Sequence, residues 1–301
     1  MSVLIDGAQL RQGFLLGADL LTHRKETLNQ LNIFPVADRD TGINMERSMK
    51  KTAANLPSEG TPAQIAEQAY MQLLEFAHGN SGTILTLFFE GFACGLPADA
   101  LAVSAGQLAD ALLKGAQTAM SGVADPMSGT ILTVAMQSAH AGVSMAEITG
   151  DAAVVFRRIV EEAHAALMQT ALQNPVLRPY RVVDSGAYGF CLILDGFLAA
   201  IAPDFPPVSY SQLILPDCPA PEEAELLHRY CTEFVLEPAE AACLDEMEDR
   251  LRCLGDYFLC VKNGTLCKVH IHTNVPDEVL QIAAFYGVLR SQKVDDMTAQ
   301  V

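Results

Sequence analysis

Residues 32–45 read NIFPVADRDTGINM, and this stretch decides how the N-terminal part of the chain is interpreted. It separates two segments whose apolar residues recur at helical spacing, so it is predicted to be a loop between helices. The loop carries two carboxylates one residue apart, Asp38 and Asp40. On a non-helical loop such carboxylates can converge on a hard cation, and Mg²⁺ typically uses one or two carboxylates together with phosphate oxygens. Asp38 and Asp40 are therefore candidate magnesium ligands with a catalytic role.

The residues that follow the aspartates are predicted to open the next helix. Thr41, Gly42 and Asn44 stand at its start, where the first backbone N–H groups have no intrahelical partner. These donors and the helix dipole attract anions, and glycine lets a phosphate approach the backbone closely. An ordinary helix cap formed by Asp40 or Thr41 is the alternative interpretation, although it does not explain the whole cluster.

Three further polar loops that contain glycine each precede a helical pattern. They read HGNSGT at residues 78–83, DPMSGT at 125–130 and VDSGAYG at 183–189. Such loops can wrap a phosphate, whereas an ordinary capped turn is the simpler interpretation of each loop alone. In an up-and-down bundle these loops can gather at one end, so that several helix N-termini surround a polyanion. The candidate nucleotide-binding residues in them are Asn80, Ser81, Gly82, Gly129, Thr130, Asp184, Ser185 and Gly186.

Residues 1–201 are predicted to be almost entirely helical. Their apolar residues recur at helical spacing through about eight segments joined by short loops, a pattern typical of an antiparallel bundle. Six prolines then fall between Ala202 and Glu223, where the chain cannot continue a helix. Residues 202–223 are therefore predicted to be a linker.

Residues 224–301 are predicted to form a small α+β domain, because the apolar pattern changes there from helical spacing to alternation. The predicted elements are strands at 230–236, 257–262 and 266–272 and helices at 239–254 and 277–286. A turn at Asn263-Gly264 is expected to join the second and third strands. This order suits a mixed sheet with helices on one face.

Two histidines and a cysteine in this second domain form a candidate metal site. His270 and His272 alternate along a predicted strand, so both imidazoles project to the same face, and Cys231 lies on a predicted neighbouring strand. Ligands of this kind suit zinc, with a fourth from water, from a carboxylate such as Glu233 or from another subunit. A polar sheet face without metal is the alternative interpretation of the histidine pair.

The composition argues against nucleic acid binding and indicates where the protein is found. The formal net charge of −17 and the pI of about 4.7 would repel a nucleic acid backbone, and no cluster of Lys and Arg offsets this charge. The sequence predicts neither a signal peptide nor a transmembrane segment. The eight cysteines lack regular disulfide spacing, so reduced thiols and a cytoplasmic location are predicted. The acidic surface permits a homodimer without requiring one.

Several motifs in a fixed order resemble a known family. The order LNIFPVADRDTGINM, HGNSGTIL, SGTILTV and VVDSGAYGF is similar to the DhaL-type, ATP-binding domain of dihydroxyacetone kinases. The LN-FPV sequence before the aspartates is closer to the ATP-binding subunit of bacterial fatty acid kinase, and YCTEFVLE with KVHIHTN extends the resemblance through the second domain. The resemblance implies an eight-helix antiparallel barrel with ATP and Mg²⁺ at one end, followed by a domain that holds zinc on Cys231, His270 and His272.

The resemblance also implies roles for individual residues. Asp38 and Asp40 match aspartates that bridge Mg²⁺ to the ATP phosphates, and Asn32 lies near a third metal carboxylate, at a spacing that differs by about one residue. Thr41, Gly42 and Asn44 match the turn that contacts the nucleotide. Residues 80–82 match the phosphate loop, and residues 184–186 match the lid near the nucleotide.

Two residues depart from the family pattern. Relatives usually have Gly between the two aspartates, where this chain has Arg39, and Arg before the phosphate loop, where this chain has His78. A cation beside the metal would compete with Mg²⁺ for the carboxylates, so Arg39 is predicted to point to solvent. ATP binding remains the expectation, and turnover is left open.

The resemblance implies a kinase whose acceptor arrives on a separate protein. In fatty acid kinase a DegV-type lipid-binding partner presents a fatty acid carboxylate, which becomes an acyl phosphate, and this is the leading interpretation. A kinase for dihydroxyacetone or a similar hydroxyketone is the second, and a non-catalytic nucleotide-binding scaffold is the third. Fatty acid kinase subunits of this kind continue into a third domain that engages the lipid carrier, whereas residue 301 lies just past the middle domain.

Overall fold

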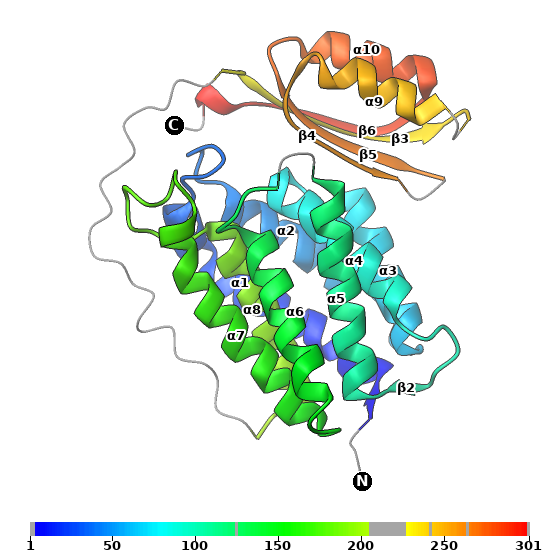
Figure 1. Ribbon diagram of the computed structural model, residues 1–301. Coiled ribbons are helices and arrows are strands. Elements are labelled where there is room, and N and C mark those ends of the chain that lie inside the picture. Colours follow the sequence, from blue (N-terminus) through cyan, green and yellow to red (C-terminus); the bar gives the residue numbers. More distant parts are fainter. Residues whose placement is uncertain (1–3, 124–125, 205–226, 241–242, 263–264, 300–301) are drawn as a thin grey trace.

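A helical domain and a smaller sheet domain make up the computed structural model shown in Figure 1. The structure describes residues 4–123, 126–204, 227–240, 243–262 and 265–299. Most of the predicted linker at 202–223 lies outside these residues, as do Asp125 and the predicted turn at Asn263-Gly264. The described parts confirm the prediction of a helical bundle followed by a small α+β domain.

The helical domain contains eight helices within the described residues, as the sequence predicts. Their bounds are α1 (Gly7–Leu31), α2 (Thr41–Ala54), α3 (Pro62–Phe76), α4 (Gly79–Gly95), α5 (Ala105–Gly122), α6 (Ile131–Ala146), α7 (Ala152–Gln173) and α8 (Ser185–Ile201). Two short strands, β1 (Ile5–Asp6) and β2 (Ala102–Val103), pair antiparallel beside them.

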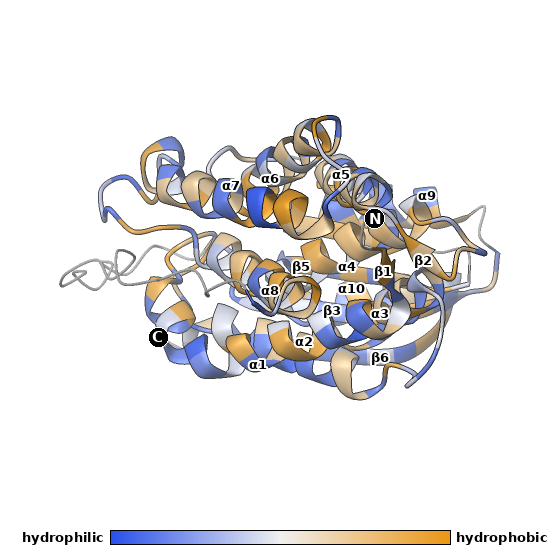
Figure 2. Ribbon diagram, turned by 90° about the horizontal axis from the view of Figure 1, so that it is seen from below, coloured by the Kyte–Doolittle hydropathy of each residue, from blue (hydrophilic) through white to orange (hydrophobic). Residues whose placement is uncertain are grey.

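The helices close into a ring around an apolar core. Each helix packs against the next one along the chain, and α8 packs against α1. Phe14 of α1 contacts Phe89 of α4 and Phe197 of α8, with ring centroids 4.9 and 5.0 Å away. Helix α7 is amphipathic, and Figure 2 shows hydrophobic and hydrophilic residues interspersed along it.

The two ends of the ring differ in how their helices begin. Successive helices of such a ring run in opposite directions, so α1, α3, α5 and α7 start at one end and the even-numbered helices at the other. At the first end every N-cap side chain accepts a backbone hydrogen bond; these residues are Asp6, Thr61, Ser104 and Asp151. At the second end Asp184 does so, whereas Asp40, His78 and Thr130 make no such bond. Three helices at that end therefore begin without a cap from the side chain of their own N-cap residue.

The sheet domain is a four-stranded sheet with two helices on one face (Figure 1). Its elements are β3 (Tyr230–Pro238), α9 (Leu244–Arg252), β4 (Gly255–Lys262), β5 (Cys267–Thr273), α10 (Pro276–Tyr286), β6 (Gly287–Asp296) and a short 3-10 helix (Met297–Ala299). The strand order is β4-β5-β3-β6, and every neighbouring pair is antiparallel. The prediction of a mixed sheet is therefore wrong, and β6 was not predicted.

The other face of the sheet covers the end of the ring where the even-numbered helices begin. Alternation along β4 shows this arrangement: Phe258 belongs to the core beneath α9 and α10, whereas Val261 is fully buried in the core of the helical domain. Leu259 also forms an isolated antiparallel bridge with Val123, which follows α5. The sheet thus lies between α9 and α10 on one side and the helical domain on the other (Figure 1). None of the helices in the described part of the chain combines the length and apolar character that a bilayer span requires.

Candidate functional site

The acidic loop between α1 and α2 is organised by the side chain of Asn32. Its Oδ1 accepts hydrogen bonds from the backbone N–H groups of Asp40, at 3.1 Å, and Thr41, at 2.9 Å, and from the Thr41 hydroxyl, at 2.7 Å. Its Nδ2 donates to the carbonyl of Val36 at 2.7 Å. Because both ends of this buried amide are engaged, Asn32 fixes the path of the loop that carries the aspartates.

Asp38 and Asp40 lie half-buried and close enough to affect each other. Burial and the neighbouring Asp40 carboxylate raise the pKa of Asp38 to about 8. Two carboxylates that repel each other in this way suit a divalent cation, which would offset both charges. The residue between them, Arg39, is exposed and has a φ of 57°, in the left-handed region that glycine adopts most readily. The prediction that Arg39 points to solvent agrees with this exposure.

The phosphate loop at the start of α4 depends on close backbone approaches. Gly79 has a φ of +67°, and a Cβ there would lie 2.6 Å from Nδ2 of Asn44. A Cβ on Gly186 would lie 2.9 Å from Oγ of Ser81, which brings the start of α8 against the same loop. The first, second and fourth of the predicted loops therefore meet at one end of the ring.

A small cavity of about 40 Å³ joins residues from both domains. The helical domain contributes the acidic loop and the phosphate loop, and the sheet domain contributes β3, β5 and the end of β6. Its walls include Asn32, Asp38, Asp40, Thr41, Asn44, Asn80, Ser81, Cys231, His270, His272 and Asp295. The predicted magnesium ligands and the predicted zinc ligands thus face one enclosed space.

A large cavity of about 540 Å³ adjoins the small one, and Pro35, Asn80 and Ser81 line both. Its volume is within the range of about 300–1,000 Å³ usual for small-molecule sites. From the helical domain it receives Thr130, Asp184 and Gly186, with apolar side chains such as Ile84, Met127 and Leu132. From the sheet domain it receives Arg252 and residues 255–259. The two domains together therefore enclose this space.

Asp184 is the buried acid of the large cavity. Its carboxylate accepts the backbone N–H of Ala187 at 2.7 Å and so caps α8. Burial raises the pKa of Asp184 to about 7, against the lowering effect of the backbone donors. This carboxyl group is therefore poised to change its charge near neutral pH.

Four of the predicted nucleotide residues do not line either cavity. A Cβ on Gly42 would lie 2.1 Å from the carbonyl oxygen of Lys25, and Gly129 has a φ of +74°. Ser185 donates to the carbonyl of Leu28 at 2.7 Å, and a Cβ on Gly82 would lie 3.1 Å from Oγ of Ser48. These residues hold the helices and loops together around the site.

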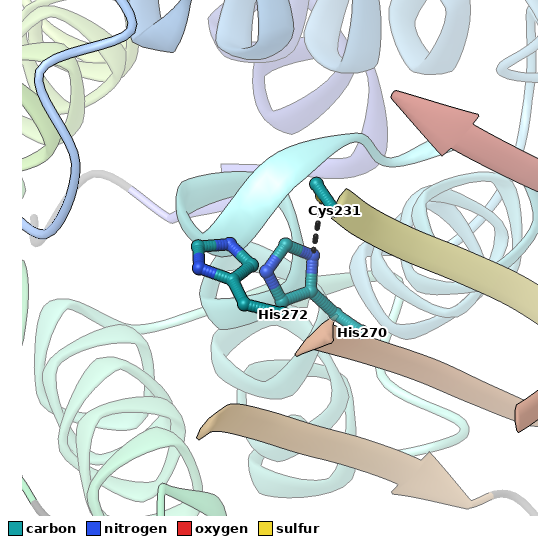
Figure 3. Close-up of side chains that lie close together, drawn as sticks. All are labelled: Cys231, His270 and His272. Carbon is teal, nitrogen blue, oxygen red and sulfur yellow. Dashed lines mark hydrogen bonds between the residues drawn. The ribbon is translucent and has the colours of Figure 1, made fainter. Parts of the chain in front are cut away.

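Cys231, His270 and His272 converge from two strands, as Figure 3 shows. Cys231 on β3 lies directly opposite His272 on β5, and one ligand atom from each of the three residues lies within 4.8 Å of the others. Val269 and Ile271 project to the other face, into the core beneath α9 and α10. The structure thus brings together the three residues that the sequence analysis predicted as metal ligands.

The chemistry of this triad fits a metal ion. Nε2 of His270 is buried and has no hydrogen-bond partner, so it is available as a ligand atom, while Nδ1 of the same ring lies 3.8 Å from Sγ of Cys231. Burial and the neighbouring His270 lower the pKa of His272 to about 3, which keeps that imidazole neutral, as metal ligation requires. Burial raises the pKa of the Cys231 thiol, so a bound cation would have to displace its proton.

Glu233 was predicted only as a candidate fourth zinc ligand, yet its carboxylate contacts residues of both domains. Its Oε1 accepts hydrogen bonds from Nδ1 of His270 at 2.9 Å and from the backbone N–H of Gly79 at 2.8 Å. Its Oε2 lies 3.6 Å from Nδ1 of His78. Burial would raise the pKa of Glu233, but its bonds to His270 and His78 hold the pKa well below its usual range. The strand position beside Cys231 was the one available signal.

Comparisons with known proteins cover both domains. The profile of the DAK2 domain matches residues 35–199, and the profile of the FakA-like middle domain of fatty acid kinase matches residues 228–301. Protein YloV of Bacillus subtilis is 32% identical over 311 residues, which are 98% of this chain and 56% of that protein. An uncharacterized protein of Staphylococcus saprophyticus is also 32% identical, over 310 residues with the same coverage, and one of Staphylococcus aureus is 30% identical. The chain spans about half the length of these curated relatives.

Proposed function

Because this chain belongs to the DAK2 domain family and carries a FakA-like middle domain of the fatty acid kinase type, we propose that it binds Mg-ATP as part of a kinase. The acceptor of the γ-phosphate would be presented by a separate protein. The leading acceptor is a fatty acid carboxylate held by a DegV-type lipid-binding partner.

The observation that carries this proposal is the pair of adjoining cavities at one end of the helical ring. The small cavity is lined by Asp38, Asp40 and the phosphate loop, and the lining of the large cavity is mainly apolar. A nucleoside triphosphate has the same division into a charged phosphate chain and a flat base. We place the phosphates beside Asp38, Asp40 and Ser81, and the base in the large cavity.

Each group at the site would have a definite task. Asp38 and Asp40 would hold Mg²⁺, which would neutralise the phosphate charge when bound. The N-termini of α2 and α4, through their helix dipoles and together with the Ser81 hydroxyl, would orient the phosphate chain. Asn32 would act on the loop, since its amide is already engaged there. Phosphoryl transfer needs chiefly this positioning and charge neutralisation.

The acceptor step needs no proton transfer when the acceptor is a carboxylate. A carboxylate oxygen would bond to the γ-phosphorus while the bond from that phosphorus to the bridging oxygen breaks, leaving acyl phosphate and ADP. ATP as the phosphate donor is consistent with the proposed cytoplasmic location.

Zinc is the ion that we propose for the triad. A thiolate and two imidazoles are ligands that zinc favours, and its fourth position would be filled by water, by Glu233 or by a group from another protomer. Such an ion would lie in the wall of the small cavity, near the phosphates rather than on a remote face.

Calorimetric titration with ATP, with and without Mg²⁺, tests the nucleotide site. Mg-dependent binding is expected for the unaltered protein and should weaken at least about tenfold in Asp38→Asn and in Asp40→Asn. Asp19→Asn, an exposed substitution on α1, serves as the matched control and should leave binding unchanged. Absence of binding to the unaltered protein would contradict the proposal.

The acceptor is tested separately by ADP release with a DegV-type protein carrying a fatty acid. Release that requires both the partner and its lipid is expected. Release with dihydroxyacetone alone would support a hydroxyketone kinase instead. Mg-ATP binding without turnover on either acceptor would support a nucleotide-binding scaffold.

A further inference from the structure

Glu233 links two sites that belong to different domains. The same oxygen, Oε1, accepts Nδ1 of His270 at 2.9 Å and the backbone N–H of Gly79 at 2.8 Å. His270 is a member of the metal triad, and Gly79 is the first residue of α4, where the phosphate loop begins. One carboxylate atom therefore touches both a predicted metal ligand and the predicted phosphate-binding helix.

The bond to His270 determines which nitrogen of that ring is available to a metal. Nδ1 can donate to Glu233 only when it carries the proton, and Nε2, which has no partner, is then the free ligand atom. Carboxylates that receive a hydrogen bond from a metal-binding histidine fix its ring orientation and strengthen it as a ligand. A metal on Nε2 would in turn hold Nδ1, and hence Glu233, in this position.

The hydrogen bond from Gly79 ties the phosphate loop to the position of the Glu233 carboxylate. Gly79 has a φ of +67°, and its N–H is one of the donors at the start of α4. His78, immediately before it, faces the second carboxylate oxygen at 3.6 Å. Glu233 is 4% exposed, so few alternative positions are open to its side chain.

We propose that Glu233 is a positioning residue that couples the two sites, so that occupation of the metal triad raises the affinity of the phosphate loop for Mg-ATP. This inference rests on the proposed function. A metal would fix the ring of His270 and through it the carboxylate, and the carboxylate would hold the first turn of α4 ready for phosphate. Coupling of this kind is reciprocal, so Mg-ATP must raise the affinity for the metal by the same factor.

The test compares nucleotide affinity in two forms of the same protein. Metal-free protein, prepared by dialysis against a chelator, and protein loaded with one equivalent of Zn²⁺ are each titrated with Mg²⁺ and an ATP analogue whose β–γ bridge is an imido group. The quantity of interest is the ratio of the two dissociation constants. For the unaltered protein the zinc-loaded form is expected to bind at least about fivefold more tightly.

Variants at Glu233 separate coupling from a simple structural role. Glu233→Ala removes both hydrogen bonds and should bring the ratio close to one, even in samples whose zinc content is verified. Glu233→Gln keeps an oxygen that can accept both bonds and should restore part of the ratio. Both variants remove the negative charge near the buried Lys268, so the fold of each is verified before titration. Glu237→Ala, on the same strand but paired with Arg290 at the surface, should keep the full ratio.

Three results would overturn the coupling. The ratio could equal one in the unaltered protein, or it could be as large in Glu233→Ala as in the unaltered protein. Tighter nucleotide binding by Glu233→Ala in both metal states would instead make Glu233 a competitor of phosphate. If the unaltered protein bound no nucleotide in either form, the proposed function itself would fail, and the coupling with it.

Discussion

Buried carboxylates dominate the candidate site at the scale of single residues. Burial raises the pKa of Asp38 to about 8 and that of Asp184 to about 7. At Glu233 burial acts in the same direction, but donors from His270 and His78 outweigh it and keep the group ionised. The cost of burying a charge thus leaves Asp38 and Asp184 ready to take up a cation or proton, whereas Glu233 stays ionised and accepts hydrogen bonds.

Asp184 should make the stability of the protein depend on pH. Its folded-state pKa of about 7 exceeds the ordinary value of 3.8, so between these values the folded protein holds a proton that the unfolded chain releases. The free energy of unfolding should therefore fall as pH rises through this window. Asp184→Asn, which keeps a capping oxygen, should be more stable than the unaltered protein at pH 8, by on the order of a few kcal/mol, and gain little at pH 4.

Denaturant unfolding at several pH values, without nucleotide or metal, measures this effect. Asp151→Asn changes the exposed N-cap of α7 at the other end of the ring and is the matched control. An Asp184→Asn advantage that is equal at pH 4 and pH 8 would contradict the assignment.

The residues of the site differ in how far the sequence could predict them. Asp38, Asp40 and the metal triad could be found because their ligand chemistry shows in short local patterns. The contact of Glu233 with Gly79 could not, because the two residues are 154 positions apart and only the docking of the domains joins them. The left-handed backbone of Arg39 was not predicted, because an arginine itself gives no sign of it; the glycine usual at this position in relatives was the one available signal.

Helix N-termini define the site at the scale of elements. The prediction that four loops gather at one end of the ring followed from alternation of helix direction, and three of their helices lack a side-chain cap there. The strand β6 could not be foreseen in the same way. It is a largely polar strand at the edge of the sheet, where β3 is its one partner among the described strands, so it lacks the apolar alternation of a buried strand.

The meeting of α8 with the phosphate loop can be tested by filling the space at Gly186. A Cβ there would lie 2.9 Å from Oγ of Ser81, so Gly186→Ala should turn the Ser81 hydroxyl away from the phosphates. Mg-ATP binding should weaken about tenfold, whereas stability should not fall, because alanine favours the helix.

A double-mutant cycle with Ser81→Ala shows whether the effect passes through that hydroxyl. Adding Gly186→Ala to a protein that already has Ser81→Ala should weaken Mg-ATP binding little further. Fully additive losses in calorimetric titrations would argue that Gly186 acts by another route.

Both domains enclose the large cavity at the scale of the whole molecule, so nucleotide should hold them together. Residues 255–259 of β4 form its wall on the sheet-domain side. With the Mg²⁺ complex of the imido ATP analogue bound, amide hydrogen exchange in this segment should slow at least about tenfold.

Mass spectrometry measures this exchange, and the amides of α10 serve as the control in the same experiment, because α10 lies on the far face of the sheet (Figure 1). Its amides should change little. Equal slowing in both segments would indicate general stabilisation, and no slowing in residues 255–259 would place the nucleotide away from the sheet domain.

The burial of Val261 in the core of the helical domain limits how the two domains can be separated in evolution. That core contains a side chain from the other domain, and Leu259 bridges to Val123 beside it. A gene that carried the helical domain alone to a new context would leave an apolar gap at the end of its ring. Recombination should therefore preserve the two domains as a pair, and a helical domain found alone should carry a different residue set at this end.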